Sequence, residues 1–461
     1  MAGPAMLIPK WRATEIMKTK LHRALIAALL PASALLAPVG AQAEDLLDIY
    51  HMAAQSDPQL KAAAANLNAV TEGQQQAKSL YYPNISFGAN ITRNREETDA
   101  GSNSFFSSST IYYNSQGYSL SLSQPIYRRD FLLQQDQSEA LVSQAQAQYE
   151  AAAQALALKA SQRYFDVLAA EDDLAFAVAE KEAISRQLEQ TKQRFEVGLI
   201  AITDVHESQA AFDLAVASEI AARNQLAIAK EALREVTGEL PSEVESLGEE
   251  MPLIGPEPAR PDDWIARALE QNLDVLAAKA AVDAAREQMK LQQSNRSPAV
   301  DLVASHNYTD TGGLFGDRQS TSSAIGVQLS IPLYQGGAIP SRIRQAQAQL
   351  DQAKEGLEQQ RRAVQRSTSE AFLNVQSNIS RVKALKQALI STRSALDATE
   401  AGYEVGTRTT VDVLDARRNL YRAERDYARA RYDYLLSTLA LKQAAGMLME
   451  EDLKQINAWL E

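Results

Sequence analysis

The sequence predicts a mostly α-helical protein with a membrane β-barrel portion, built from two copies of one structural plan. Three observations support this fold class. Glycine and proline account for 20 and 15 of the 461 residues, about 8 % together where about 12 % is usual, so helix breakers are scarce over long distances. Similar segments around Gly198 and Gly406 lie 208 positions apart. Short runs of alternating apolar and polar residues, the pattern of a β-strand, stand between the helical segments.

Composition excludes several functional classes. Hydrophobic residues make up 45 % of the chain and charged residues 23 %, so a folded protein is expected. Cysteine is absent, which excludes disulfides, thiolate metal sites and thiol catalysis. The formal net charge of -12 leaves no basic surface for nucleic acid. The four histidines are scattered and no phosphate-binding loop or nucleophile elbow is present, so neither an enzyme nor a cofactor is expected.

Residues 1–43 have the order of a cleaved secretory signal. A basic stretch precedes a short apolar one, and Ala41-Gln42-Ala43 supplies the small residues of a cleavage site. Two prolines and the short apolar length argue against the alternative, a membrane-anchoring helix. We expect translation to start at Met17, with residues 1–16 a misassigned extension, and the mature chain to begin at Glu44.

The remaining chain consists of two structural repeats, residues 44–238 and 264–446. The segment Phe195-Glu-Val-Gly-Leu-Ile-Ala-Ile-Thr-Asp-Val corresponds to Tyr403-Glu-Val-Gly-Thr-Arg-Thr-Thr-Val-Asp-Val. The connector 239–263 is acidic and holds five of the fifteen prolines, which is typical of a solvated linker. Because both repeats keep the same order of motifs, we expect them to share one arrangement of helices and strands.

Each repeat opens with a helical segment of about 50 Å, at residues 48–80 and 264–296. A β-hairpin follows, at residues 84–123 in the first repeat and 299–331 in the second. Strands of about ten residues can cross a membrane when tilted. The clearest alternating apolar positions are Tyr118, Leu120, Leu122, Ile325, Val327, Leu329 and Ile331.

A very long helix follows each hairpin. Arg128 to Glu196 contains neither glycine nor proline and would rise about 104 Å, and Ser341 to Glu404 would rise about 96 Å. Each is expected to turn at Val-Gly and return as a shorter helix, at residues 203–238 and 410–446. Placed end to end, a returning helix and a hairpin-preceding helix match one long helix, so each repeat would form two columns of equal height.

The second long helix carries a coiled-coil pattern, because apolar residues recur every seven positions. The seam residues are Ile343, Leu350, Leu357, Val364 and Ala371, continued by Val375, Val382, Leu389, Leu396 and Tyr403.

Four strands cannot close a barrel, and lipid does not tolerate an open sheet edge. Several chains would therefore pool their hairpins, with two chains supplying eight strands and three supplying twelve. The alternative, common among proteins in general, is that the strands form a half-buried sheet in a soluble domain. The signal segment favours the membrane interpretation.

The two tip segments, together with Arg431-Tyr-Asp-Tyr-Leu-Leu, resemble those of the TolC family of outer-membrane efflux and secretion channels. This resemblance implies a homotrimer, with a 12-stranded barrel in the outer membrane of a Gram-negative cell and a long α-helical barrel in the periplasm. The connector 239–263 and the tail 447–461 would form an equatorial belt. Outer-membrane lipid would surround the barrel, which alone would anchor a chain that lacks a lipidated cysteine.

The resemblance also implies a function and partners. The protein would be the exit duct of a tripartite efflux or type I secretion system, opened at its periplasmic tip by an adaptor protein and an inner-membrane pump or ABC transporter. The alternative is a periplasmic coiled-coil adaptor, which would share the helical hairpins but remain soluble.

Asp412 and Asp415 are candidate gate residues. Their spacing places both on one helix face. Three-fold symmetry would gather six carboxylates around one axis, which would attract cations and permit cation block without a resident metal. The alternative is a stabilising interaction between acids in the first turn and the helix dipole.

Four further residues correspond to a closed-state latch of the family, which pairs Tyr403 with Asp204 and Arg408 with Thr203. The chemistry would be a phenol donating to a carboxylate and a guanidinium donating to an oxygen. The alternative for Thr203 and Asp204 is a helix N-cap.

The tips themselves are Gly198 and Leu199 in the first repeat and Gly406 and Thr407 in the second. Each glycine would permit a left-handed turn after a helix and leave the next residue exposed. The resemblance implies that these tips contact the adaptor.

Overall fold

The computed structural model describes residues 44–98, 109–241, 243–248, 251–313 and 316–460. The chain divides into two units, Met1–Gln42 and Ala43–Glu461, and only the second contains described residues. The expected signal segment therefore lies outside the described residues.

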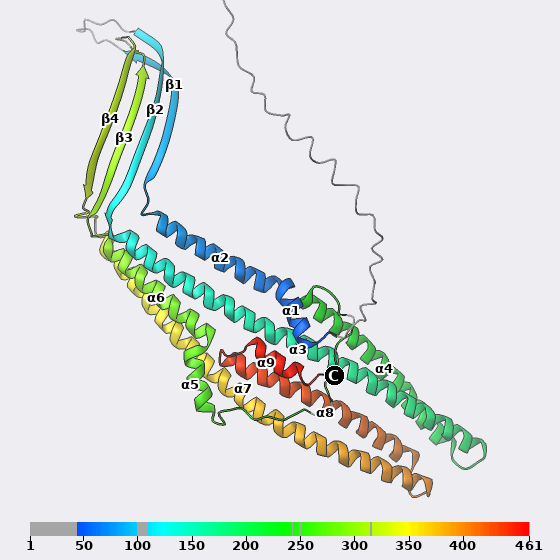
Figure 1. The fold of residues 1–461 in the computed structure, drawn as a ribbon. Coiled ribbons are helices and arrows are strands. Elements are labelled where there is room, and N and C mark those ends of the chain that lie inside the picture. The colour runs from blue at the N-terminus through cyan, green and yellow to red at the C-terminus, as the bar shows by residue number, and fades with distance from the viewer. Residues whose placement is uncertain (1–43, 99–108, 242, 249–250, 314–315, 461) are drawn as a thin grey trace, which may run out of the picture. The chain divides into compact units, whose positions relative to one another are not determined.

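The described part is mostly helical, with one four-stranded sheet (Figure 1). Within it, no helix combines the length and apolar character needed to cross a membrane. The elements in chain order are α1 (Leu46–Ser56), α2 (Pro58–Ser79), β1 (Asn84–Thr98), β2 (Ser109–Arg128), α3 (Arg129–Glu196), α4 (Ile202–Thr237), α5 (Pro261–Gln271), α6 (Leu273–Ser294), β3 (Ala299–Thr311), β4 (Arg318–Ser330), α7 (Ala338–Glu404), α8 (Thr410–Ala444) and α9 (Glu450–Asn457).

The two hairpins join into a single antiparallel sheet in the order β1-β2-β3-β4. Strand β2 of the first repeat pairs with β3 of the second, with Leu120 opposite His306. The register shifts between Pro125 and Tyr127, where proline lacks the N–H that a regular ladder requires. The sheet therefore unites strands that are nearly 200 residues apart in the chain.

The helices lie side by side, each long helix against shorter ones (Figure 1). Helix α3 contacts α2 and α4, and α7 contacts α6 and α8, while α3 also contacts α6 and α8. Helices α4 and α2 together rise about 87 Å against about 102 Å for α3, and α8 with α6 match α7 similarly.

The segment 48–80 is two helices rather than the single helix predicted, because Asp57 interrupts it. Its Oδ1 accepts the backbone N–H of Leu60 at 2.9 Å and so caps α2, which begins at Pro58. Asp57 is only 2 % exposed, and its Oδ2 lies 3.4 Å from Nζ of Lys159 on α3. A buried carboxylate needs such partners. The junction between α1 and α2, called the first corner below, is therefore fixed to α3.

The segment 264–296 is likewise two helices, broken at Asn272. The Asn272 Oδ1 accepts the N–H groups of Asp274 and Val275, and its Nδ2 donates to the Ala444 carbonyl at 3.0 Å. Asn272 thus caps the start of α6 and the end of α8 at once. Two stacked helices meet at this residue, which is the physical reason for the break.

The prediction of a solvated linker at 239–263 is wrong for much of that segment. The Glu245 carbonyl accepts the Tyr164 hydroxyl at 2.7 Å, and the Ile254 N–H donates to the Tyr434 hydroxyl at 2.8 Å. Leu247 is 8 % exposed. The connector covers the aromatic side chains of α3 and α8, and helix α5 already begins at Pro261.

The largest buried cluster lies where the connector, α1, α5 and α9 meet the long helices. Tyr164 and Tyr434 are almost fully buried there, and the rings of Phe165 and Tyr432 stack with centroids 5.7 Å apart. The seven-residue seam of α7 is confirmed: its ten positions are buried or half-buried, with Leu350 and Val364 among the most buried.

The contact between α8 and the α5–α6 corner makes Gly446 sensitive to substitution. Its φ of +73° is left-handed, and an added Cβ would lie 2.6 Å from Asn272 Cα. We expect Gly446→Ala to destabilise the fold by at least about 2 kcal/mol, measured as a lower apparent unfolding temperature of the full-length protein.

The matched control is Gly356→Ala. Gly356 lies inside α7, and nothing stands within 4 Å of an added Cβ. This variant should be neutral or stabilise by up to about 1 kcal/mol. Equal unfolding temperatures for the two variants would contradict the proposed strain at the corner.

Candidate functional site

The two tips are tight turns between long and returning helices. Gly198 follows α3 with φ +72°, and Gly406 follows α7 with φ +80°, so both predicted left-handed turns are confirmed. Leu199 is 72 % exposed, and Thr407 is also exposed. The tips therefore present side chains to solvent.

The second tip is closed by contacts to Gly402 in the last turn of α7. The Thr407 hydroxyl donates to the Gly402 carbonyl at 3.0 Å. A Cβ on Gly402 would meet Cγ of Arg408 at 2.8 Å, so a larger residue would displace the arginine. Gly402 therefore allows Arg408 to lie against the helix end.

Asp412 forms a reciprocal capping box at the start of α8. Its Oδ2 accepts the Thr409 N–H at 2.8 Å and the Thr409 hydroxyl at 2.9 Å, while the Asp412 N–H donates to the Thr409 hydroxyl oxygen. These donors hold the pKa of Asp412 below its usual value. The capping alternative for Asp412 is thus realised in the folded chain, and it leaves the carboxylate ionised.

Asp415 lies one turn further along α8 and remains largely open to solvent. Its side chain is 62 % exposed and lies 3.7 Å from Arg418, a distance at which a surface ion pair contributes little. Both carboxyl groups therefore lie near the second tip. Within the described residues, no group of three or more metal-ligating side chains is present.

The latch residues meet other partners in the single chain. The Tyr403 hydroxyl accepts the Thr410 hydroxyl at 3.3 Å, and the guanidinium of Arg194 lies 4.8 Å from the Tyr403 ring centroid. Among the described contacts, no hydrogen bond or ion pair joins Tyr403 to Asp204 or Arg408 to Thr203.

The N-cap alternative for Thr203 and Asp204 is wrong, because Ala201 occupies the N-cap position of α4. Thr203 and Asp204 lie inside the first turn, and no side chain satisfies the N-cap. The acid of Asp204 still lies at the positive end of the helix dipole. Both side chains therefore remain at the tip surface.

Polar contacts tie α8 to α3, and the sequence reasoning did not identify them. Arg417 donates to the Ala183 carbonyl at 2.8 Å and pairs with Glu400 at 2.7 Å. Tyr421 donates to a further carbonyl of α3, and Arg425 lies 3.6 Å from Glu180. The spacing of four between these residues of α8 was the available signal, because it places them on one helix face.

Three consecutive acidic residues of α3 extend this row of polar contacts between helices. Glu171 pairs with Lys230 of α4 at 2.9 Å, and Asp172 accepts the Tyr432 hydroxyl of α8 at 2.6 Å. Burial raises the pKa of Asp172 and of Asp173. The acids thus fix α3 to both returning helices.

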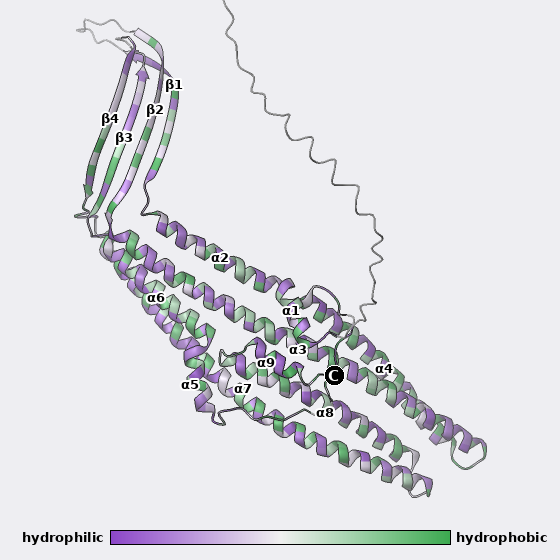
Figure 2. Ribbon diagram, viewed as in Figure 1, coloured by the Kyte–Doolittle hydropathy of each residue, from purple (hydrophilic) through white to green (hydrophobic). Residues whose placement is uncertain are grey.

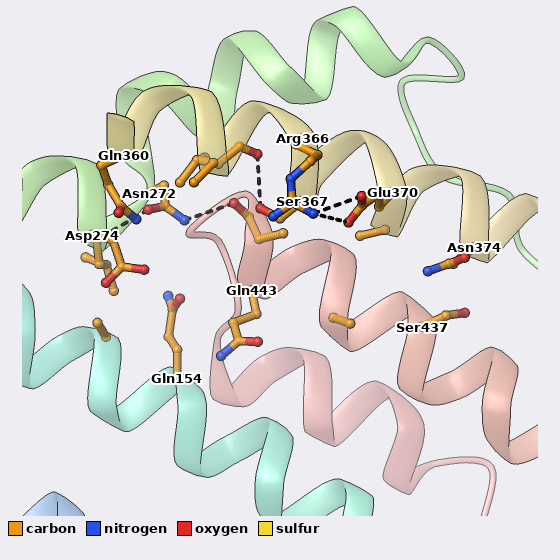
Figure 3. Close-up of a pocket in the computed structure, with 17 residues that line it drawn as sticks. Gln154, Asn272, Asp274, Gln360, Arg366, Ser367, Glu370, Asn374, Ser437 and Gln443 are labelled. Carbon is orange, nitrogen blue, oxygen red and sulfur yellow. Dashed lines mark hydrogen bonds and ion pairs between the residues drawn. The ribbon is translucent and has the colours of Figure 1, made fainter. Parts of the chain in front are cut away.

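A polar cavity of about 490 Å³ lies beside the second helix corner, between α3, α6, α7 and α8 (Figure 3). Arg366 corresponds to Lys159 of the first repeat at the offset of 207. Lys159 pairs with the capping residue Asp57 of its corner, whereas Arg366 pairs with Glu370 of its own helix at 3.0 Å. At one side of the cavity, the Gln154 side-chain amide donates to the Gly446 carbonyl at 3.2 Å. Ten of the seventeen lining residues are polar or charged, so the cavity suits water and hydrogen-bonding groups.

Apolar and polar residues are mixed along the strands (Figure 2), and the ladder register sorts them onto two faces of different character. Residues directly opposite each other in a ladder share a face, so the alternation on each strand aligns across all four. The face called apolar here carries Ile85, Phe87, Ile91, Tyr118, Leu120, Leu122, Val300, Leu302, His306, Tyr308, Ile325, Val327 and Leu329, and nearer the hairpin turns it becomes polar, with Arg93, Asn114, Gln116, Asp310 and Gln319. The opposite face carries Ser86, Asn90, Ser119, Ser121, Ser305, Asn307, Gln328 and Ser330.

The apolar face is uncovered in the single chain. Ile91 is 83 % exposed and Ile325 78 %. At its far end the rings of Tyr118 and Tyr308 stack with centroids 5.3 Å apart. An exposed apolar surface of this kind marks contact with lipid or with another chain.

The capping box predicts a pH-dependent helix start. Because the folded pKa of Asp412 is lowered, its carboxylate stabilises the first turn above the unfolded pKa of about 4 and loses this effect as the pH falls through the lower folded value. We expect Asp412→Asn to speed amide exchange of residues 410–413 several-fold at pH 7, measured by mass spectrometry. The difference from the wild type should vanish well below pH 4.

Asp415→Asn is the matched control, because Asp415 accepts no backbone N–H in the described structure. It should leave the exchange of these amides unchanged. An equal effect of both substitutions would contradict the capping role.

Comparison with known proteins agrees with this geometry. A family model described as outer membrane efflux protein matches residues 49–239 and 264–447. Outer membrane protein TolC of Vibrio cholerae is 40 % identical over 423 residues, covering 91 % of this chain and 94 % of the relative. The alkaline protease secretion protein AprF of Pseudomonas aeruginosa is 28 % identical over 441 residues, covering 95 % and 91 %. The Campylobacter jejuni CmeC outer membrane channel has the same fold, with a TM-score of 0.75 at 16 % identity over 90 % of each chain. The chain therefore belongs to the outer membrane efflux protein family.

Proposed function

We propose that the protein is the outer-membrane exit duct of a tripartite efflux or type I secretion system. The observation that carries this proposal is the four-stranded sheet, which exposes an apolar face over its half nearer the helices but has too few strands to close on itself. Long helices free of any membrane-spanning apolar stretch extend the chain beyond the sheet. Family membership supports the same function, with relatives named for efflux and for protease secretion.

Three copies would pool their strands into a 12-stranded barrel, with lipid against the apolar face and water against the serine-rich face. Their helix columns, twelve in all, would form a ring about 35 Å across with a bore of about 25 Å at usual helix spacings. The barrel would lie in the outer membrane of a Gram-negative cell and the helices in the periplasm. Residues 1–43 would direct export, and the connector 239–263 and tail 447–461 would form the belt.

A periplasmic adaptor would contact the tips Gly198, Leu199, Gly406 and Thr407, and would link the duct to an inner-membrane pump or ABC transporter. The exposed apolar side chains at the tips support this assignment, since Leu199 and Val405 are 72 % and 75 % exposed. The alternative, that the chain is itself a soluble adaptor, does not explain the exposed apolar sheet face. No enzymatic role is proposed.

Asp412 and Asp415 would form the periplasmic gate. The pKa of Asp412 is lowered by its hydrogen bonds to Thr409, Asp415 is 62 % exposed one turn further along α8, and three-fold symmetry would collect six such carboxyl groups. Replacing both by alanine should raise at least tenfold the concentration of a multivalent cation needed to half-block single-channel current in planar bilayers. This experiment also tests the function, because a duct must conduct.

The matched control is Asp397→Ala, which removes one carboxylate from α7 away from the turn. Its block should equal that of the wild type. Unchanged block in the double variant would overturn the gate assignment, and an absence of any channel current would overturn the duct.

Tyr403 with Asp204 and Arg408 with Thr203 would form the closed-state latch, reaching across neighbouring helices or chains. All four residues lie in or beside the turns. Tyr403→Phe combined with Arg408→Ser should raise closed-state conductance severalfold, since fewer hydrogen bonds would hold the tips together.

The control for the latch is Tyr50→Phe with Arg267→Ser, the same pair of changes on α1 and α5. It should leave the conductance as in the wild type. A latch variant that conducts no more than this control would exclude the latch.

A further inference from the structure

A second cavity, about 260 Å³ in volume, lies where the connector meets α5, α8 and α9. Its lining includes Trp264, Tyr434 and Trp459, with Val375, Leu439 and Ile456 completing the apolar wall. The volume lies just below the range of about 300–1,000 Å³ that is usual for ligand pockets, so only a small ligand would fit, and the mixture of aromatic walls with a few polar groups is typical of such pockets. This belt pocket is separate from the tips and from the sheet.

The polar atoms of two aromatic residues are already used. The Tyr434 hydroxyl accepts the Ile254 N–H at 2.8 Å and donates to the Ile254 carbonyl at 3.0 Å. The Trp264 indole N–H donates to the Pro258 carbonyl at 2.8 Å. These bonds hold the connector over the pocket. Tyr434 is 1 % exposed and Trp264 4 %, so these two rings form the closed back wall of the pocket, and the half-buried Trp459 supplies the aromatic surface that a ligand can reach.

The charged groups of the belt pocket leave a negative surplus. Lys442 and Asp452 pair at 2.5 Å, and the second oxygen of Asp452 accepts the Met449 N–H at 2.8 Å, so these two charges offset each other. Glu257 lies at the pocket and is exposed. In the described part of the chain it has no hydrogen-bond or ion-pair partner. One carboxylate is therefore free beside an aromatic wall.

We propose that the belt pocket is a binding site for a small organic cation with an apolar body, such as an aromatic quaternary ammonium compound. The cation would be attracted by the ring of Trp459 and by Glu257, and its apolar part would lie against the buried wall that Leu439 and Ile456 complete. Occupation would join the connector to α8 and α9. This inference does not depend on the chain acting as a duct.

Tryptophan fluorescence can report binding at this pocket. The chain has three tryptophans, Trp11, Trp264 and Trp459, and the latter two both line the pocket. Benzyltrimethylammonium titrated into the detergent-purified full-length protein should produce a saturable change in tryptophan emission. The neutral benzyl alcohol and the anionic phenylacetate should bind at least tenfold more weakly.

Glu257→Gln should weaken benzyltrimethylammonium binding at least threefold, measured by calorimetry as well as fluorescence. The matched control is Asp262→Asn in the first turn of α5, which removes the same charge from the belt without lining the pocket. Its affinity should stay within twofold of the wild type. Binding that is absent, equally weakened by both substitutions, or tighter for phenylacetate would overturn the proposal, the last result assigning the pocket to anions held by Lys442.

Discussion

Two helices of nearly 70 residues each can bury their apolar seams only if other helices accompany them along their length. No single returning helix in this chain is long enough, so each long helix is covered by two shorter ones that meet end to end. The ends of those helices expose backbone groups that must find partners. The corners at Asp57 and Asn272 follow from this one requirement.

The two corners provide partners for these helix-end backbone groups through different side chains. At the first, a buried carboxylate caps α2 and pairs with Lys159. At the second, a neutral amide caps α6 and binds the end of α8, while Arg366 turns to Glu370 and a polar cavity remains. The repeats therefore share a plan but differ in local electrostatics. The α8 helix, which carries Asp412 and Asp415, is tied to α3 by directional polar contacts, which can exchange partners more readily than an apolar core.

Sequence reasoning predicted the hairpins, both long helices and the glycine turns to within a few residues. It did so because those features are local: scarce helix breakers, period-two alternation and left-handed glycines. It missed the break at Asp57 although Asp57-Pro58 is a local signal for a helix start, and it missed the break at Asn272 because the Ala444 carbonyl that Asn272 binds is 172 residues away in the chain. It also took the connector for a solvated linker, because charge and proline content reveal nothing of the aromatic side chains on α3 and α8 that the connector covers.

At the candidate site, the sequence located the tips and the two aspartates, and its resemblance to the outer-membrane channels agreed with the family that the chain matches. The partners of those residues came from the fold: Thr409 for Asp412, Thr410 and Arg194 for Tyr403. By itself the sequence determined the elements, the repeat and the family, because each depends on residue periodicity or on the spacing of motifs along the chain. Only the tertiary structure decided the helix corners, the belt and the single apolar sheet face, because these depend on contacts between residues that are distant in sequence.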